Sequence, residues 1–264
     1  MMNHRDVITS RDNPSVKHFR KLLDSKKERS SENAFVIEGK RLVLDAFKSG
    51  ADIERVFITC AALGKYGEEI GELYTRCNVT VISDEIGRWV SDTDNTQGIF
   101  AKCSIPQSAR SLPALKAGGR YAVMSKVRDP GNVGMIIRTA DAFGIDGAIF
   151  SESCDIFNPK TVRSTMGSIF RLPVYCDISA EEIFHALECA GLLSFAAVVD
   201  REAEDIRNVD LKGGGAVFIG NEANGLDRDI KERCTQLVTI GMNGNAESLN
   251  AAMAAGIIMW ELVR

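Results

Sequence analysis

Hydrophobic residues recur at helical spacing near the start of the chain and then gather in short runs. An amphipathic helix is predicted to begin after Asn13-Pro14, a typical helix start. Its apolar face is formed by Val16, Phe19, Leu22 and Leu23, and lysines and arginines fill much of the rest. Apolar runs at 34–39, 55–59 and 79–83 predict buried strands around a helix near 40–49. The first hundred residues are therefore predicted to form a small α/β unit.

A polar stretch with prolines and glycines, 106–119, predicts a linker between two domains. Beyond it, apolar strands alternate with helices. Strands are predicted at 121–127, 147–150, 172–176, 194–199, 216–220 and 237–240, and helices from Val133, near Lys160, near Ala180 and at the C-terminal end. This alternation is typical of a mostly parallel sheet covered by helices on both faces. The predicted fold class is α/β, with domains at 1–105 and 120–264.

The charge distribution bears on whether the protein binds nucleic acid. The chain of 264 residues has a net charge of −4, which does not suggest a nucleic-acid-binding protein. Residues 1–48, however, hold 11 Lys/Arg and 7 Asp/Glu, a local net charge of +4. Such a segment fits a phosphate backbone, and it equally fits the solvated face of a helix. Charge alone leaves both interpretations open.

Cysteine and histidine content argues against a metal centre and against a disulfide scaffold. The seven cysteines are odd in number and never spaced as Cys-x-x-Cys, and His4, His18 and His185 lie far from any metal-ligand spacing. No apolar run of about eighteen residues occurs, and the N-terminal residues lack the apolar stretch of a secretory signal. We therefore expect a cytoplasmic protein with no metal site and no membrane span.

Three loops in the second half are unusually polar, and each follows an apolar strand. They are 128–144 with a turn at 129–132 and Arg138, 217–226 with Glu222, and 241–250 with Ser248 and Asn250. Taken singly, each has an ordinary explanation: Asn132 as a turn residue, Arg138 as a surface residue, or Asn250 as a helix cap. Ligands of parallel α/β sheets nevertheless bind at such loops. The G-x-G-x-x-G and G-x-x-x-x-G-K-[ST] nucleotide signatures are both missing.

Taken together and in order, the three loops resemble the motifs of the SpoU/TrmH family of RNA ribose 2′-O-methyltransferases, within the SPOUT class. The first has Asn132, Gly134 and Arg138 at the family spacing, the second reads IGNEANGL, and the third reads ESLNAAMAAGI. Residues 7–105 are similar to the family's RNA-binding extension, a small domain with a ribosomal-protein-like fold. One departure is Gly241, where the third motif usually carries Pro and where Gly loosens the turn.

The resemblance implies a C-terminal domain threaded into a deep trefoil knot, which general topology rules do not favour. It also implies S-adenosyl-L-methionine as cofactor, RNA as substrate and a homodimer formed through the C-terminal domain. The cofactor-binding residues carried over from the motifs are Gly220, Asn221, Ile240, Met242, Leu249 and Val198. The candidate RNA-binding residues of the basic segment are Arg11, Lys17, Lys21, Lys26 and Arg41.

The catalytic residues implied by the motifs are Arg138, Asn132, Ser248, Asn250 and Glu222. A ribose hydroxyl is a poor nucleophile until its proton leaves, so the site must orient it and stabilise the forming oxyanion. We expect Arg138 to act as an electrostatic clamp, because a guanidinium stays protonated at neutral pH, and Asn132 to position it or the ribose. Proton loss to water or to a transiently neutral Arg138 is left open. Ser248 and Asn250 are expected to cap a terminal helix that begins near Ser248, and Glu222 to brace the loops rather than act as a base.

Two other functions are compatible with parts of the sequence. A non-catalytic RNA-binding protein of the same fold would be favoured by loss of motif residues, but Asn132, Arg138 and Glu222 are all present. A nucleotide-dependent oxidoreductase lacks its phosphate signature. Among RNA substrates, the extended N-terminal domain favours 23S-type ribosomal RNA over transfer RNA, and the sequence does not indicate the nucleotide.

Overall fold

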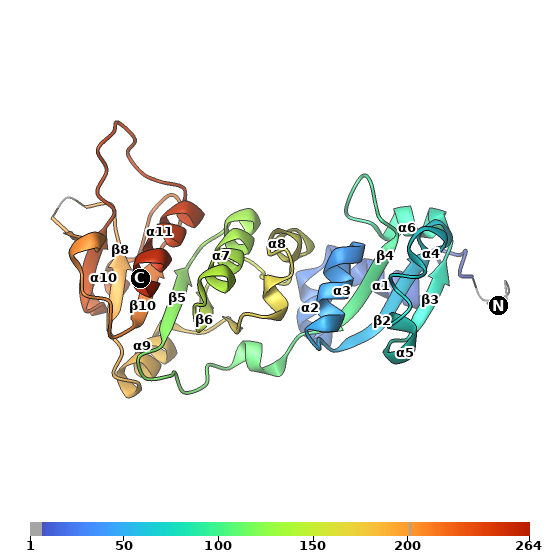
Figure 1. The fold of residues 1–264 in the computed structure, drawn as a ribbon, viewed down its shortest axis with the longest axis horizontal. Helices are drawn as coiled ribbons and strands as arrows, with labels where there is room; N and C mark the ends of the chain where they lie inside the picture. Colours follow the sequence, from blue (N-terminus) through green and yellow to red (C-terminus); the bar gives the residue numbers. More distant parts are fainter. Residues whose placement is uncertain (1–6, 201) are drawn as a thin grey trace. The chain divides into compact units, whose positions relative to one another are not determined.

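The computed structural model describes residues 7–200 and 202–264, which form two compact units (Figure 1). Unit 1 holds the described chain up to Pro106 together with Phe157–Phe170, and unit 2 holds Gln107–Ile156 and Arg171–Arg264. The stretch predicted as a linker begins with a short 3₁₀ helix, η2 (Gln107–Arg110), and its Leu115 is buried in the core of unit 2. A segment from the second half of the chain is therefore part of the N-terminal unit.

Unit 1 is built, within the described residues, on a four-stranded sheet of order β1-β4-β2-β3. Its strands are β1 (Ala34–Glu38), β2 (Ile53–Thr59), β3 (Val79–Ile82) and β4 (Ile99–Ser104). Its helices are α1 (Pro14–Asp24), α2 (Lys26–Glu32), α3 (Lys40–Lys48), α4 (Cys60–Tyr66), α5 (Leu73–Arg76), α6 (Asp84–Val90) and α8 (Pro159–Ser164), with the 3₁₀ helix η3 (Ser168–Phe170). The predicted small α/β unit is confirmed. The central strand β4, antiparallel to β1 and β2, was not predicted.

Helix α1 starts where its sequence predicts. The side chain of Asn13 accepts a hydrogen bond from the backbone N–H of Ser15 (3.0 Å), and Pro14 occupies the first helical position. The four predicted apolar residues are all buried, and the ring of Phe19 lies 5.5 Å from that of Phe57 between centroids. Packing of this apolar stripe on the sheet stabilises a helix that would be marginal alone.

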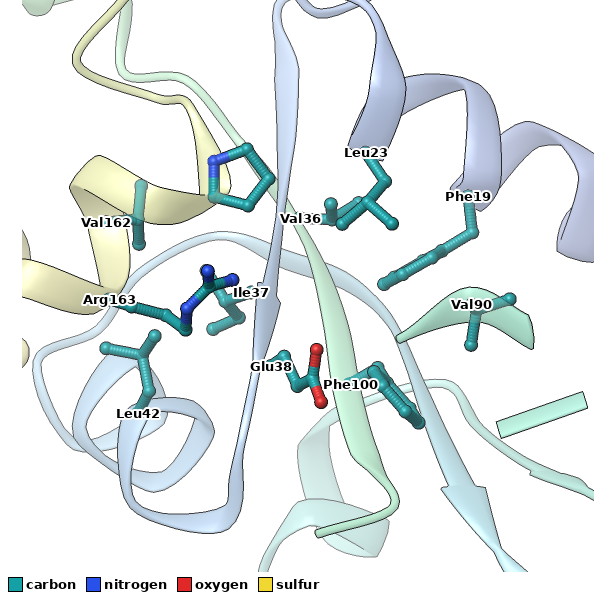
Figure 2. Close-up of a pocket in the computed structure, with 11 residues that line it drawn as sticks. Phe19, Leu23, Val36, Ile37, Glu38, Leu42, Val90, Phe100, Val162 and Arg163 are labelled. Carbon is teal, nitrogen blue, oxygen red and sulfur yellow. The ribbon is translucent and has the colours of Figure 1, made fainter. Parts of the chain in front are cut away.

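The later segment of unit 1 packs on strand β1. The rings of Phe157 and Phe170 lie 4.9 Å and 6.2 Å from that of Phe35, and Arg163 donates a hydrogen bond of 2.7 Å to Asp92. A cavity of about 10 Å³ lies at this contact, and Figure 2 shows the side chains that line it. Side chains that line it include Phe19, Val36, Leu42, Phe100 and Val162. A cavity of this size holds no more than about one water molecule, so it is a packing defect rather than a ligand site.

Unit 2 is built on a parallel sheet whose strand order, within the described residues, is β7-β6-β5-β10-β8-β11-β9. Its strands are β5 (Arg120–Ser125), β6 (Gly147–Ser151), β7 (Val174–Cys176), β8 (Ser194–Ala197), β9 (Glu204–Asp205), β10 (Gly215–Ile219) and β11 (Gln236–Thr239). Its helices are α7 (Pro130–Phe143), α9 (Ala180–Cys189), α10 (Arg228–Arg233) and α11 (Ala251–Val263), with the 3₁₀ helix η4 (Ile206–Asn208). The predicted parallel α/β sheet is confirmed, whereas β9 and α10 were not predicted. The knot implied by the resemblance stays a prediction.

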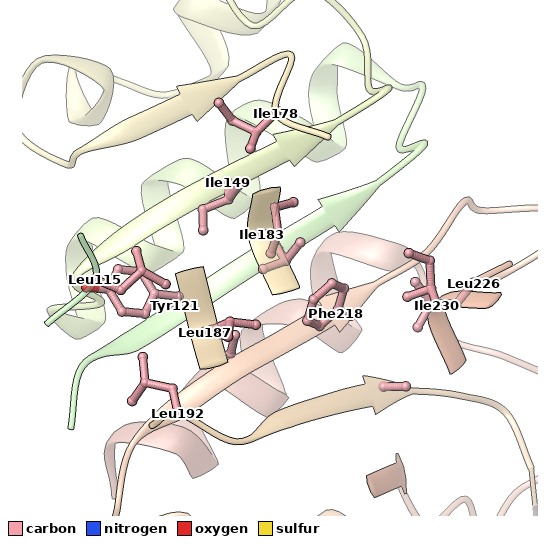
Figure 3. Close-up of a cluster of buried hydrophobic side chains, with 13 residues drawn as sticks. Leu115, Tyr121, Ile149, Ile178, Ile183, Leu187, Leu192, Phe218, Leu226 and Ile230 are labelled. Atoms are coloured by element: carbon pink, nitrogen blue, oxygen red, sulfur yellow. The ribbon is translucent and has the colours of Figure 1, made fainter. Parts of the chain in front are cut away.

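Both faces of this sheet are buried. On one face, Ile149 of β6 and Phe218 of β10 are both in register with Val123 of β5, the strand between them. These residues belong to one core cluster with Ile183 and Leu187 of α9 (Figure 3). On the other face, α7 and α11 pack against the strands and against each other. Strands covered on both sides are continuous apolar runs, which is why the sequence of unit 2 shows little alternation within its strands.

Helix α7 begins earlier than predicted. The residues predicted as a turn, 129–132, form its N-cap and first turn, so that prediction was wrong. Asp129 is the N-cap and accepts a hydrogen bond of 2.8 Å from the backbone N–H of Asn132, and Pro130 occupies the first helical position. An acceptor followed by Pro is a strong helix start because it satisfies a free N–H and presets φ.

Within the part of the chain that the structure describes, no helix is long and apolar enough to cross a membrane. The same residues contain no group of three or more His, Cys, Asp or Glu side chains arranged to hold a metal ion.

Candidate active site

Four loops emerge at one edge of the unit 2 sheet, and the three that follow β5, β10 and β11 are the polar loops that the sequence singled out. Strands β10, β8 and β11 are parallel neighbours, so their carboxyl ends lie at the same edge, and the loops that follow begin at Gly220, Val198 and Ile240. Strand β5, the other neighbour of β10, leads into α7 at this edge. The sheet order therefore gathers the polar loops that the sequence singled out.

The carboxylate of Glu222 is the centre of a hydrogen-bond network between two of these loops. Its Oε1 accepts from Nδ2 of Asn132 (3.0 Å) and from the backbone N–H of Asp129 (3.3 Å). Its Oε2 accepts from the backbone N–H of Arg128 (3.3 Å). The carboxylate thus ties the start of α7 to the loop after β10.

These donors decide the ionisation state of Glu222. Partial burial favours the neutral acid, but hydrogen bonds from Asn132 and from the backbone N–H groups of Glu222, Arg128 and Asp129 outweigh it, and the pKa of Glu222 is lowered from its ordinary value of 4.5. A carboxylate with a lowered pKa is a weaker base. The geometry therefore suits a brace rather than a proton acceptor.

Asn250 extends the network to the third loop. Its Nδ2 donates a hydrogen bond of 2.9 Å to Oδ1 of Asn132, while its Oδ1 accepts from the backbone N–H groups of Ala252 (2.9 Å) and Met253 (3.2 Å). Asn250 is therefore the N-cap of α11. The expectation that this helix begins near Ser248 was wrong, because the side chain of Asn250 already satisfies the free N–H groups of the first turn.

The second loop is a tight turn built by Asn221. Its backbone N–H and C=O both bond to Gly225, its Oδ1 accepts from the N–H of Ala223 (2.9 Å), and its Nδ2 donates to the carbonyl of Lys126 (3.0 Å). Gly220 precedes it, and a Cβ there would lie 2.2 Å from the carbonyl carbon of Gly225. Only glycine fits at a backbone approach this close.

Arg138 and Ser248 lie outside this network. Arg138 is exposed on α7, and among the described residues no hydrogen bond or ion pair engages its guanidinium. Met135 and Ala142, three residues before and four after it, share this exposed face. Ser248 is exposed in the loop before α11. The structure thus joins Asn132, Glu222 and Asn250 and leaves Arg138 free to meet a ligand.

The candidate cofactor-binding residues flank the three loops. Gly220 is buried, Val198, Asn221, Ile240 and Leu249 are half-buried, and Met242 is exposed within the loop Gly241–Ser248, all of which is exposed. Apolar side chains and an exposed loop therefore lie together at this edge.

Two contacts at this edge of the sheet were missed from the sequence. Asp129 was assigned to a turn, although Asp-Pro before an apolar-periodic stretch is a helix-start signal. Lys126, directly after β5, forms an ion pair of 2.6 Å with Asp227, which raises the pKa of Lys126. No sequence signal indicates this pair, because the two residues are 101 positions apart.

The candidate RNA-binding residues of unit 1 are all exposed. Three of them are paired with carboxylates: Arg11 with Glu85, Lys17 with Asp12 and Arg41 with Asp45. Lys21 on α1 and Lys26 on α2 are exposed, and within the described residues neither forms an ion pair. Two candidate residues without an ion pair therefore lie at the end of α1 and the start of α2.

Comparisons with known proteins agree with this architecture. The family model described as the SpoU rRNA Methylase family matches residues 119–260, and the model described as the MRM3-like substrate binding domain matches residues 13–101. The 23S rRNA (guanosine(2553)-2'-O)-methyltransferase RlmP of Bacillus subtilis (strain 168) is 32% identical over 257 residues, covering 97% of this chain and 98% of RlmP.

Solved structures give the same relationship. The AdoMet-bound rRNA methyltransferase from Sinorhizobium meliloti has a TM-score of 0.84 and 31% identity, with 97% of this chain and 96% of that chain covered. The SpoU methyltransferase AviRb from Streptomyces viridochromogenes, in complex with the cofactor AdoMet, has a TM-score of 0.85 and 26% identity, with 95% and 97% covered. The family match spans more than half of the sequence and the relatives align along nearly all of it, so this chain belongs to the SpoU rRNA methylase family.

Proposed function

We propose that this chain transfers a methyl group from S-adenosylmethionine to the 2′-hydroxyl of a ribose in ribosomal RNA of the 23S type. The observation that carries the proposal is the hydrogen-bonded series Glu222–Asn132–Asn250, which joins the three motif loops at one edge of the sheet. The names of relatives support the substrate and the cofactor, since RlmP is named for 23S rRNA and two similar structures contain AdoMet. A ribosomal substrate places the reaction in the cytoplasm.

The residues at the loop edge fit this cofactor. An adenosine needs apolar contacts for its ring and peptide donors and acceptors for its polar edge. Val198, Ile240, Met242 and Leu249 offer the first, and the exposed backbone of the loop 242–248 offers the second. When bound, S-adenosylmethionine supplies an electrophilic methyl group on a positively charged sulfur.

The remaining chemistry falls to side chains of α7 and its neighbours. Arg138, with no intramolecular partner among the described residues, orients the RNA phosphate and stabilises the oxyanion that forms as the ribose hydroxyl loses its proton. The amide of Asn132 is hydrogen-bonded through its nitrogen to Glu222 and through its oxygen to Asn250. It can therefore position the ribose without having to become ordered during the reaction. Ser248, exposed beside the cofactor loop, lines the entrance to the site.

Unit 1 presents the RNA. Its match to a substrate-binding domain model supports this role, as does the concentration of exposed lysines at α1 and α2. Lys21 and Lys26 are the leading contacts because neither is neutralised by a carboxylate within the described chain. Arg11, Lys17 and Arg41 contribute less, since each must first release its acidic partner.

A second copy of the chain covers the outer face of α7 and α11. Met135, Met253 and Trp260 are 48%, 60% and 52% exposed there, and Trp260 lies 5.4 Å from Phe143 between ring centroids. Exposed apolar residues gathered on two packed helices are typical of a subunit interface. Arg138 lies on the same face of α7 as Met135, so dimerisation would bring the catalytic edges of both copies near the interface.

Calorimetric titration with S-adenosylmethionine and a methyl-transfer assay on ribosomal RNA test the proposal. We expect saturable binding of one cofactor per chain and transfer of its methyl group. Methylation of transfer RNA alone would show that the substrate is transfer RNA and not ribosomal RNA. RNA binding without any cofactor binding would favour a non-catalytic RNA-binding protein.

A further inference from the structure

Gly241, the first residue of the loop Gly241–Ser248, is packed against a side chain from another strand. A Cβ built on Gly241 would lie 2.4 Å from Oδ2 of Asp205 and 3.0 Å from Nη2 of Arg207. Gly241 is not among the glycines with positive φ, so its backbone conformation is open to other residues. A larger residue at this position would therefore have to displace the side chains of Asp205 and Arg207, although the dihedral angles of Gly241 would accept it.

Asp205 is itself firmly held. Its Oδ1 accepts from the backbone N–H (3.0 Å) and Nε (2.8 Å) of Arg207, and its Oδ2 accepts from Nη2 of the same residue (2.7 Å). The side chain of Asp205 is only 19% exposed. The side-chain and backbone hydrogen bonds from Arg207, with a smaller contribution from the backbone N–H of Gly241, lower the pKa of Asp205 to about 2. The carboxylate is thus ionised and fixed in place at neutral pH.

The fold puts this pair at the point where the loop begins. Asp205 ends strand β9, which pairs with β11 so that Asp205 is opposite Thr239, two residues before Gly241. From Gly241 to Ser248 every residue is exposed, and the hydrogen-bonded Asn250 fixes the far end. The exposed loop is therefore held by hydrogen bonds at both ends. Asp205 accepts one from the backbone of Gly241 at its start, and Asn250 donates one to Asn132 just beyond its end.

We propose that Asp205 and Arg207 form a clasp that holds Gly241 and sets the path of this loop, which makes Asp205 a positioning residue for cofactor binding. The inference rests on the proposed function in one respect, namely that the loop binds S-adenosylmethionine. A loop already held in its binding conformation loses less conformational entropy when a ligand binds. Disturbing the clasp should therefore weaken cofactor binding while leaving the reacting groups in place.

The test is a double-mutant cycle on cofactor affinity, measured by calorimetry. Gly241→Ala should weaken S-adenosylmethionine binding roughly tenfold, because the new methyl group displaces the clasp. In the Asp205→Ala background, where that space is empty, Gly241→Ala should cause no further loss. In the Asp205→Asn background, which keeps the volume, the loss should persist. Gly213→Ala, where nothing lies within 4 Å of the added methyl group, is the matched control and should bind as wild type.

Three further readouts separate positioning from general destabilisation. The KM for S-adenosylmethionine should rise in Gly241→Ala with kcat nearly unchanged, and the thermal midpoint should stay close to that of Gly213→Ala. Hydrogen exchange of the amides of 242–249, measured without cofactor, should accelerate in Gly241→Ala and not accelerate further when Asp205→Ala is already present.

The outcomes distinguish the clasp from the proposed function. Wild-type affinity in Gly241→Ala, or an equal loss from Gly241→Ala in the Asp205→Ala background, would overturn the clasp. If the wild-type chain binds no S-adenosylmethionine, the proposed function fails, and the exchange pattern alone then decides whether the clasp exists.

Discussion

The side-chain amide of Asn250 donates a hydrogen bond of 2.9 Å to Oδ1 of Asn132, a residue 118 positions earlier in the chain. Asn250 also caps α11, and Asn132 in turn donates to Glu222, so each loop of the site fixes the next. Polar groups held in this way need little reorganisation when charge develops on a substrate. The network therefore accounts for how loops far apart in the sequence make one site.

Asn250→Asp separates the two roles of this residue. Aspartate keeps an acceptor for the first turn of α11, but its carboxylate cannot donate to Asn132. We expect a free energy of unfolding close to that of wild type. Methyl transfer should be slower by on the order of 100-fold, because the loop before α11 is no longer held against the start of α7. Urea unfolding and single-turnover transfer measure the two effects.

The control for that variant is Ser179→Ala, which removes the cap of α9 in the same unit. It should cost about 1 kcal/mol of stability and leave transfer unchanged. Equal transfer rates in Asn250→Asp and Ser179→Ala would show that the contact between the two asparagines has no part in activity.

Glu222→Gln should reveal the brace through the pH dependence of stability. The pKa of Glu222 is lowered in the folded protein from its ordinary value of 4.5, so the carboxylate stabilises the fold above that pH and loses this contribution as the pH falls through the lowered value. The variant should have a lower free energy of unfolding than wild type at neutral pH, and the difference between the two should disappear at acidic pH. A gap of constant size from neutral to acid pH would argue against an ionised brace.

Arg138→Ala should abolish methyl transfer while the affinity for S-adenosylmethionine stays within about a few-fold, since the guanidinium acts on RNA and the oxyanion. Arg228→Ala, which removes an exposed arginine paired with Glu232 on α10, is the control and should transfer normally. Loss of cofactor binding in Arg138→Ala would instead assign Arg138 to the cofactor site.

Replacing Lys17, Lys21 and Lys26 by Ala should weaken RNA binding and reduce its salt dependence. Each lost phosphate contact lowers the slope of log K against log salt by about 0.7 for single-stranded RNA, so three contacts lower it by about 2. The control triple replaces Lys116, Lys212 and Lys231 of unit 2, removing the same charge. A slope that responds equally to both triples would exclude a specific role for α1 and α2.

The proposed dimer predicts that Trp260→Glu yields a monomer in light scattering, because a buried carboxylate at an apolar interface lacks a partner. Leu193→Glu changes a residue that is also 48% exposed but belongs to neither α7 nor α11, and it should leave the mass unchanged. A wild-type chain that is already monomeric at micromolar concentration would contradict the proposed interface.

Local patterns in the sequence were sufficient for most elements of the fold. Asn13-Pro14 and the apolar stripe after it predicted α1 because a cap and a buried face are local properties. Strand β4 was missed although its alternation is visible, and β9 was missed because two residues carry no periodic signal. The start of α7 was placed late because Asp129-Pro130 is compatible with both a turn and a helix start.

The site was predictable as a set of loops but not as a set of contacts. The resemblance named Asn132, Glu222 and Asn250, yet their hydrogen bonds depend on β10 lying beside β5, which no local pattern encodes. The same holds for Asp205, whose relation to Gly241 depends on the pairing of β9 with β11. Long-range register is set by packing of the whole sheet.

The most direct test of the proposed function is to incubate the protein with S-adenosylmethionine carrying a labelled methyl group and ribosomal RNA from cells that lack its gene. We predict label at a single nucleotide of the large-subunit RNA, on a ribose, so that the adjacent phosphodiester bond resists alkaline cleavage. Label on a base, or no transfer to any RNA by a protein that binds the cofactor, would contradict the account.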